Sequence, residues 1–386
     1  MNKGAVTSFA GTVIAVDDQT QTVKFCSAAD DGSSLSTSSV SFNASALDNQ
    51  FFEMLGELVK QEIEKNPKLD MQKVSLILPD RLFLLDTVSI PVIHRKAMQQ
   101  SLSLAVEAVY KNAADLSLMT YTIQQNKQTA TFGLVGVRRE TLGFANDALH
   151  NAGAPVSAIT YSASAMSNAA MALNGKLKND SFLLVDIKKG VTRFALVVRG
   201  VTMGYYGLPF GYEILHTSRV VSEDSLFDNR AGKLLVLNAK EKARAKQLTV
   251  ETPITYVHDE DDAEAFELPP EHEIRKSGRR LPKFMQRPIP ESEEGFIYEN
   301  FRVFLKWSLE LINNNRDIVS FSKLDTVYVN MPEKYNFLFD VVNGKQAGRG
   351  ITFAPLITES CDASISENLE LYGGFYIGRF NEANTF

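Results

Sequence analysis

The feature that most constrains the fold is a repeated pattern, in which an apolar strand ends in aspartate and is followed by a turn and a second strand. The first copy runs from Thr12 through Asp17 to Cys26, and the second runs from Phe182 through Asp186 to Val198. Each copy is typical of a β-hairpin with an acid at its tip. Two such hairpins in one chain predict a duplicated α/β core with a cleft between the two halves.

Length and charge exclude several classes of protein. The chain has 386 residues, of which 44% are hydrophobic, so it can form roughly two or three buried cores and is not a disordered protein. Its formal net charge of −6 provides no general attraction to nucleic acid or anionic lipid. The two cysteines, Cys26 and Cys361, form no CxxC pair or disulfide framework, which favours a reducing cytoplasm and two buried thiols.

No segment has the pattern of a membrane span or a secretory signal. The most apolar stretch, Val74 to Ile93, is interrupted by charged residues and prolines, whereas a spanning helix needs about 18 unbroken apolar residues. The first residues, Met1 to Gly11, lack the apolar region of a signal peptide. We therefore expect no direct insertion into a membrane.

The segment 74–160 has the element order of a small α+β module, which we expect to be inserted into the first half. The other parts of that half are residues 1–73 and a return helix within 161–180. The apolar patterns predict helices from about Arg95 and Glu140, and strands at Val74–Leu78, Leu82–Ile90, Thr131–Val137 and Val156–Ile159.

The second half is expected to begin with a three-stranded meander in 181–212, to continue through a helical region in 213–320, and to end in 321–386. Within the helical region, 258–295 combines an acidic run, a basic run and several prolines, which is typical of a mobile insertion. An amphipathic helix at Tyr298–Asn314 precedes a strand at Thr326–Asn330. The segment Tyr372–Ile377 is predicted to be a turn or strand and not a helix.

Few residues are candidates for catalysis. The five histidines lie at no spacing that suggests a triad or a metal site, and the motifs GxSxG, GxxxxGK[ST], HExxH and GxGxxG are absent. Two interpretations of the hairpins are left. In one, their turn N–H groups hold a polyphosphate and their aspartates hold hydrated Mg²⁺. In the other, Asp17 and Asp186 end strands and start turns, as aspartate commonly does.

Both turns resemble the phosphate loops of actin-like proteins of the FtsA and PilM group, which act in bacterial division and pilus assembly. Residues 15–24 (AVDDQTQTVK) match the first loop at Asp17, Val23 and Lys24 and lack its two glycines. Residues 185–192 (VDIKKGVT) match the second loop except for its first glycine, which Lys188 replaces. The prolines that flank the strand at Leu82–Ile90 resemble the start of the 1C domain that this group carries.

The resemblance implies an actin-like fold of the ASKHA, ribonuclease H-like type, with duplicated halves and an inserted α+β 1C-type subdomain. It implies a site for ATP and Mg²⁺, the metal lying near Asp17 and Asp186. Six residues are the candidates for this site: Asp17, Lys24, Asp186, Gly190 and Thr192, which match the family, and Lys188, which replaces its glycine.

The nucleotide motifs are degenerate. After the strand that ends at Asn330, the family has paired glycines, whereas this chain has Met331 and Pro332. Gln19, Lys188 and Met331 each bring a Cβ where glycine leaves space, and Pro332 also removes an N–H. An alternative is that Lys188 or Lys189 supplies charge to a phosphate. No residue can be assigned to orient an attacking water, so hydrolysis is expected less than ATP binding, and the chain is expected not to be an enzyme.

The resemblance implies a cytoplasmic scaffold of a type IV pilus or related secretion machine, with self-association possible in this group. Its partner would be the short cytoplasmic tail of a PilN-like inner-membrane protein, held in a groove beside the 1C domain, which would place the protein at the inner face of the membrane. One alternative is a working Mg-ATP switch. Another is an FtsA-like division protein, but Tyr372–Phe386 lacks the apolar helical stripe that membrane attachment requires.

Overall fold

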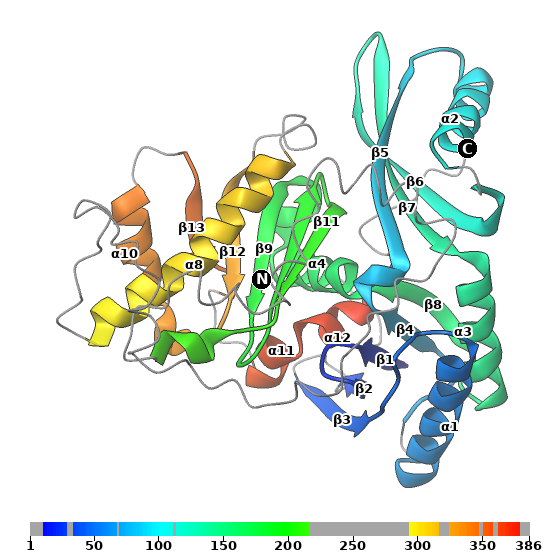
Figure 1. Ribbon diagram of the computed structural model, residues 1–386, viewed down its shortest axis with the longest axis horizontal. Helices are drawn as coiled ribbons and strands as arrows, with labels where there is room; N and C mark the ends of the chain where they lie inside the picture. The colour runs from blue at the N-terminus through cyan, green and yellow to red at the C-terminus, as the bar shows by residue number, and fades with distance from the viewer. Residues whose placement is uncertain are drawn as a thin grey trace, which may run out of the picture.

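The computed structural model describes residues 11–28, 34–67, 69–110, 113–216, 293–315, 324–346, 350–357 and 362–378. Its framework is two five-stranded sheets of the same topology (Figure 1). The first has the order β3 (Leu35–Ser41), β2 (Thr22–Ala28), β1 (Thr12–Asp17), β4 (Val74–Leu78), β8 (Val156–Tyr161). The second has the order β11 (Val201–Leu208), β10 (Thr192–Val198), β9 (Ser181–Ile187), β12 (Leu324–Asn330), β13 (Thr352–Pro355).

The pairing within the two sheets is also the same. In each sheet, the three strands that come first in the sequence form an antiparallel meander. The other two strands run parallel to the first strand of that meander, which is β1 or β9. Every residue of β1 and β9 is buried, as expected for central strands that are covered on both faces. The predicted duplication of an Asp-tipped hairpin is therefore confirmed, and each hairpin lies at the centre of its sheet.

Helices pack on the sheets and contribute side chains to two main hydrophobic cores. In the first half, α1 (Asn49–Lys65), α3 (Arg139–Asn151) and α4 (Ser162–Leu173) contribute buried apolar residues to one core. In the second half, α8 (Glu293–Asn314) and α10 (Phe337–Gln346) contribute to the other. The helix expected at Tyr298–Asn314 thus begins earlier, at Glu293.

The middle module is narrower than the predicted 74–160. Strands β4 and β8 belong to the first sheet, and the separate sheet has the order β5 (Phe83–Pro91), β7 (Thr129–Arg138), β6 (Leu116–Gln125), with α2 (Arg95–Val109) packed on it. Strand β6 was absent from the predicted order. It is an edge strand with mostly half-buried residues, so its apolar pattern is weaker than that of a central strand.

The C-terminal segment differs from the prediction. Residues 372–374 end a short helix, α12 (Leu369–Gly374), which follows α11 (Ala363–Glu367), so the prediction of a turn or strand was wrong for these residues, whereas 375–377 form a turn, as predicted. A Cβ on Gly373 would lie 1.7 Å from the carbonyl oxygen of Ala165 in α4. Gly373 and Gly374 disfavour a helix by their sequence, but their lack of a side chain lets α12 pack closely on α4 and β1.

Some sequence predictions fall outside the described residues. These include Cys361 and the expected insertion 258–295 as far as residue 292. Cys26 is buried, as predicted, and burial raises the pKa of its thiol to about 12. Among the described helices, none combines the length and the apolar character needed to cross a bilayer.

Candidate functional site

The carboxylate of Asp17 lies at the end of β1 with both of its oxygens engaged. Oδ1 accepts the backbone N–H groups of Gln19, at 3.1 Å, and Thr20, at 3.2 Å. Oδ2 forms ion pairs with Nη2 of Arg193, at 2.7 Å, and Nζ of Lys24, at 3.6 Å. Two N–H groups of this turn, which the sequence suggested would bind a phosphate, therefore donate to Asp17 itself.

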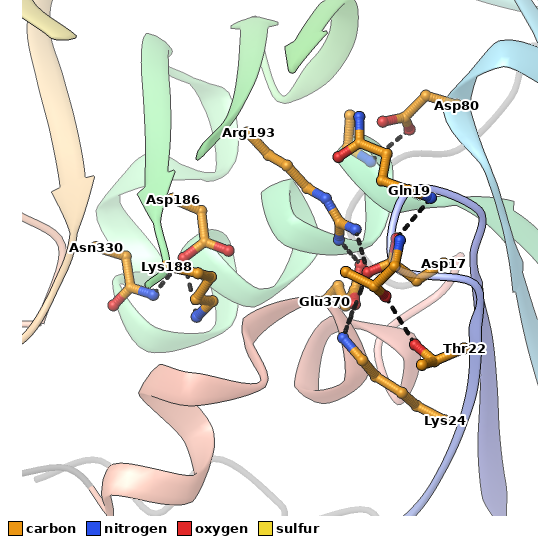
Figure 2. A network of polar contacts seen from close by, with 12 residues as sticks. Asp17, Gln19, Thr22, Lys24, Asp80, Asp186, Lys188, Arg193, Asn330 and Glu370 are labelled. Carbon is orange, nitrogen blue, oxygen red and sulfur yellow. Dashed lines mark hydrogen bonds and ion pairs between the residues drawn. The ribbon is translucent and has the colours of Figure 1, made fainter. Parts of the chain in front are cut away.

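Glu370 of α12 contacts the same two cations. Its Oε1 lies 3.2 Å from Nζ of Lys24, and its Oε2 pairs with Nη1 of Arg193. Figure 2 shows Arg193 reaching from β10 toward Asp17 and Glu370, with Lys24 on their other side. We call Asp17, Lys24, Arg193 and Glu370 the cleft cluster. It joins β1 and β2 of the first half, β10 of the second half and the C-terminal helix, and its formal charges cancel.

The cleft cluster keeps its members charged. Burial alone would raise the pKa of Asp17, but Arg193 and Lys24 outweigh it and lower that pKa below its ordinary value. The same two cations overcome burial and lower the pKa of Glu370. Glu370 in turn raises the pKa of Lys24. Two anions and two cations therefore neutralise one another across the neutral pH range.

The second hairpin has its own polar cluster, which Figure 2 shows apart from the first. Oδ1 of Asp186 lies 3.0 Å from Nζ of Lys188 and accepts from Nδ2 of Asn330 at 2.6 Å. Lys188 and Asn330 also donate to the backbone carbonyl of Ser366, which lies in α11. Lys188 thus neutralises the acid of its own loop and binds the C-terminal segment.

Two other predicted site residues have no such polar role. The hydroxyl of Thr192 is buried and donates to the carbonyl oxygen of Phe210 at 2.9 Å. Gly190 is exposed, and a Cβ there would meet Oε1 of Glu213 at 3.5 Å, an ordinary contact. The glycine that this turn requires is Gly211, because its Cβ would lie 1.9 Å from the carbonyl oxygen of Lys188.

Gln19 lies between the halves. Nε2 of its side chain is 2.9 Å from the point where a Cβ on Gly207, in β11, would be. Gln19 stands where the resembling loops have glycine, so its side chain occupies space that the backbone of those loops leaves open.

The arrangement of donors does not fit Mg²⁺. Magnesium is held by oxygen ligands and bound water. Here Asp17 faces Lys24 and Arg193, and Asp186 faces Lys188, so a second cation would lie against ammonium and guanidinium groups. Within the part of the chain that the structure describes, no three His, Cys, Asp or Glu side chains gather as metal ligands.

The structure brings together four of the six residues proposed from the sequence, as two neutral pairs: Asp17 with Lys24, and Asp186 with Lys188. Their assignment as nucleotide ligands stays a prediction. Sequence reasoning missed Arg193 and Glu370. Arg193 had a local signal, because it pairs with Asp186 across the hairpin, whereas Glu370 had none.

A groove lies beside the middle module. It has a volume of about 330 Å³ and is lined by side chains of β5, β6 and β7 on one side and of α3 and β8 on the other. Apolar residues predominate, among them Met119, Val137 and Leu142. Met119 is 42% exposed, so the groove presents an accessible apolar side chain.

The comparisons with known proteins yield structural matches alone. No family model and no curated protein matches the sequence. A chain of the PilM–PilN type IV pilus biogenesis complex matches with a TM-score of 0.50 and 12% identity, over 94% of this chain and 97% of that one.

Two further structures match less well. The cytoplasmic domain of EpsL, an inner-membrane component of the type II secretion system of Vibrio cholerae, has a TM-score of 0.35 and 12% identity, over 55% of this chain and 75% of that one. The ethanolamine utilization protein EutJ of Carboxydothermus hydrogenoformans has a TM-score of 0.32 and 11% identity, over 94% and 88%. The match to a chain of the PilM–PilN complex, at a TM-score of 0.50, confirms the expected actin-like fold and the structural resemblance to that protein.

Proposed function

We propose that this protein is a cytoplasmic scaffold of a type IV pilus or related secretion machine, held at the inner face of the membrane by a protein partner. The observation that carries this proposal is the match in fold to a chain of the PilM–PilN complex, which extends over nearly the full length of both chains.

The proposed partner is the short cytoplasmic tail of a PilN-like inner-membrane protein, and the proposed site is the groove beside the middle module. Three observations support this site. The groove has room for several side chains, its lining is mainly apolar, and it lies where a separate sheet meets the first half. Apolar clefts between structural units are common binding sites.

We further propose that the cleft is degenerate and does not take Mg-ATP. The contacts of Asp17 and Asp186 with basic side chains support this, as does Gln19 between the halves. The alternative is a Mg-ATP switch, in which these ion pairs would have to separate before a nucleotide could enter.

The partner proposal is tested with synthetic peptides that copy the cytoplasmic tails of single-span membrane proteins encoded beside this gene. We expect one of them to bind, and Met119→Glu to weaken binding by about tenfold or more, because a carboxylate would have to be buried against the apolar groove. Val341→Glu is the matched control, since Val341 is a similarly exposed apolar residue (37%) on α10 of the other half. The proposal fails if no tail binds, or if both variants weaken binding equally.

The nucleotide proposal is tested by calorimetric titration of the purified protein with ATP, with and without Mg²⁺. We expect no magnesium-dependent binding. Micromolar binding that requires Mg²⁺ and is abolished in a folded Asp186→Ala variant would establish the switch instead.

A further inference from the structure

Two basic side chains from opposite halves meet on one carboxylate. Lys24 comes from β2 and Arg193 from β10, and each contacts a different oxygen of Glu370. The side chains of Glu370 and Arg193 are only 7% and 12% exposed. Two cations that hold the separate oxygens of one anion make the arrangement by which proteins bind carboxylates and phosphates.

We propose that Lys24 and Arg193 form an anion site and that Glu370 is its resident occupant. In this view α12 supplies an internal anion, which draws the two halves together in place of a phosphate from solution. The site would accept a small free anion, carboxylate or phosphate, once the Glu370 side chain is removed.

The packing of α12 explains why Glu370 stays in place. Leu369 and Leu371, on either side of it, are fully buried. The carbonyl oxygen of Ala165 and the side chain of Val13 leave no room for a Cβ on Gly373 and Gly374. A free anion would have to displace a buried helix along with the carboxylate, so the intact protein holds its own ligand.

The charges around the site give the proposal a clear consequence. Asp17 also contacts Lys24 and Arg193, so the intact cleft cluster is neutral. Without Glu370, the two positive charges of Lys24 and Arg193 share one carboxylate in direct contact, that of Asp17, so one charge loses its contacting partner. Such a charge is costly to leave uncompensated, which favours uptake of an anion from solution.

The experiment follows thermal unfolding of Glu370→Ala in increasing phosphate and, separately, acetate. Phosphate stabilises most folded proteins because it is excluded from their surface. Binding is therefore shown by stabilisation that saturates as the phosphate concentration rises, and not by stabilisation alone. Phosphate at about ten times its dissociation constant favours the folded form about elevenfold. We expect saturable stabilisation in Glu370→Ala, and a non-saturating response in the intact protein and in Glu367→Ala, an exposed acid on neighbouring α11.

The double variant Arg193→Met/Glu370→Ala lacks one arm of the site and is expected to lose the saturable response. A response of Glu370→Ala that matches the control overturns the proposal, and so does saturation that survives in the double variant. Saturation with acetate but not phosphate assigns the site to carboxylates, whereas saturation with both assigns it to either anion.

A second set of variants applies if Glu370→Ala does not fold. Glu370→Gln keeps the side-chain volume and removes the charge. In the intact protein Lys24→Met should reduce stability, whereas in the Glu370→Gln background it should be neutral or stabilising, because Lys24 has then lost one of its two counter-ions. An equal loss in both backgrounds refutes the role of Glu370. Neither readout involves a membrane partner, so this proposal and the one on tail binding stand or fall separately.

Discussion

Arg193 is the residue through which the cleft cluster can be tested most directly. It contacts Asp17 and Glu370, whose side chains are 3% and 7% exposed, and Arg193→Met removes both contacts while retaining a long apolar side chain. Removal of one partner from a buried ion pair costs about 3–5 kcal/mol, because the other charge is left uncompensated. Lys24 remains beside both acids, so we expect a loss near the lower end of that range at pH 8.

The dependence of stability on pH should also differ between Arg193→Met and the intact protein. In the intact protein the pKa values of Asp17 and Glu370 are lowered, so their contribution is present above the ordinary values of 3.8 and 4.5 and is lost as the pH falls through the folded values. The pKa of Lys24 is raised, so its contribution is present below its ordinary 10.5 and is lost as the pH rises through the folded value. Between these limits the contribution of the cluster is constant.

In Arg193→Met, the two acids lose the cation that lowers their pKa values most, while burial still raises them. We expect both pKa values to rise above their ordinary values, so that the folded protein binds protons that the unfolded chain does not bind. Its stability should therefore increase as the pH falls from 8 to 5, with a slope of up to about 1.4 kcal/mol per pH unit for each proton taken up. Part of the loss at pH 8 is recovered in acid.

The assay is urea unfolding at pH 5, 6, 7 and 8, followed by circular dichroism and by fluorescence of Trp307, the single tryptophan. Arg302→Met is the matched control, since Arg302 pairs with Glu299 on α8 while 41% exposed. An exposed pair contributes about 0–1 kcal/mol. The reasoning is refuted if Arg193→Met loses no more stability than the control, or if its pH profile is parallel to that of the intact protein.

Two further substitutions, Gly211→Ala and Asp80→Asn, test the packing and the burial near the cleft cluster. Gly211→Ala should lower the free energy of unfolding by about 1–3 kcal/mol, because its Cβ would overlap the carbonyl oxygen of Lys188. A Cβ on Gly143, inside α3, would meet no atom within 4 Å, so Gly143→Ala should raise the free energy of unfolding by up to about 1 kcal/mol in the same urea titration. Burial raises the pKa of Asp80 to about 7, so the folded form retains a proton that the unfolded form loses, and stability falls as the pH rises from about 4 to 7. Asp80→Asn keeps an acceptor for the N–H of Ala163, now 2.8 Å from Asp80, and should abolish this loss; an unchanged pH profile in a folded variant would contradict it.

The two hairpins were predictable because the evidence for each is local. Alternating burial, a polar turn and the paired strand all lie within a short segment, and the periodicity of two follows from strand geometry. The approach of Lys24 to Asp17 has the same origin, since Lys24 pairs with Ala15 across the hairpin. The repetition of that hairpin accounts for the matching antiparallel pairs β1–β2 and β9–β10 of the two sheets.

The C-terminal helix shows where local reasoning fails. Gly373 and Gly374 disfavour a helix by intrinsic propensity. Because they lack a side chain, however, α12 can contact α4, and that contact stabilises the helix. The gain comes from tertiary packing, which a propensity does not contain.

Sequence alone determined the two hairpins, their duplication and the presence of an acid at each hairpin tip. Only the tertiary structure decided what those acids face. Arg193 and Glu370 are 177 positions apart, and Lys24 and Glu370 are 346 apart. Charges so distant in the chain meet only when helix and sheets pack, because their pairing depends on the return of α12 to the first half and on no pattern within any one segment.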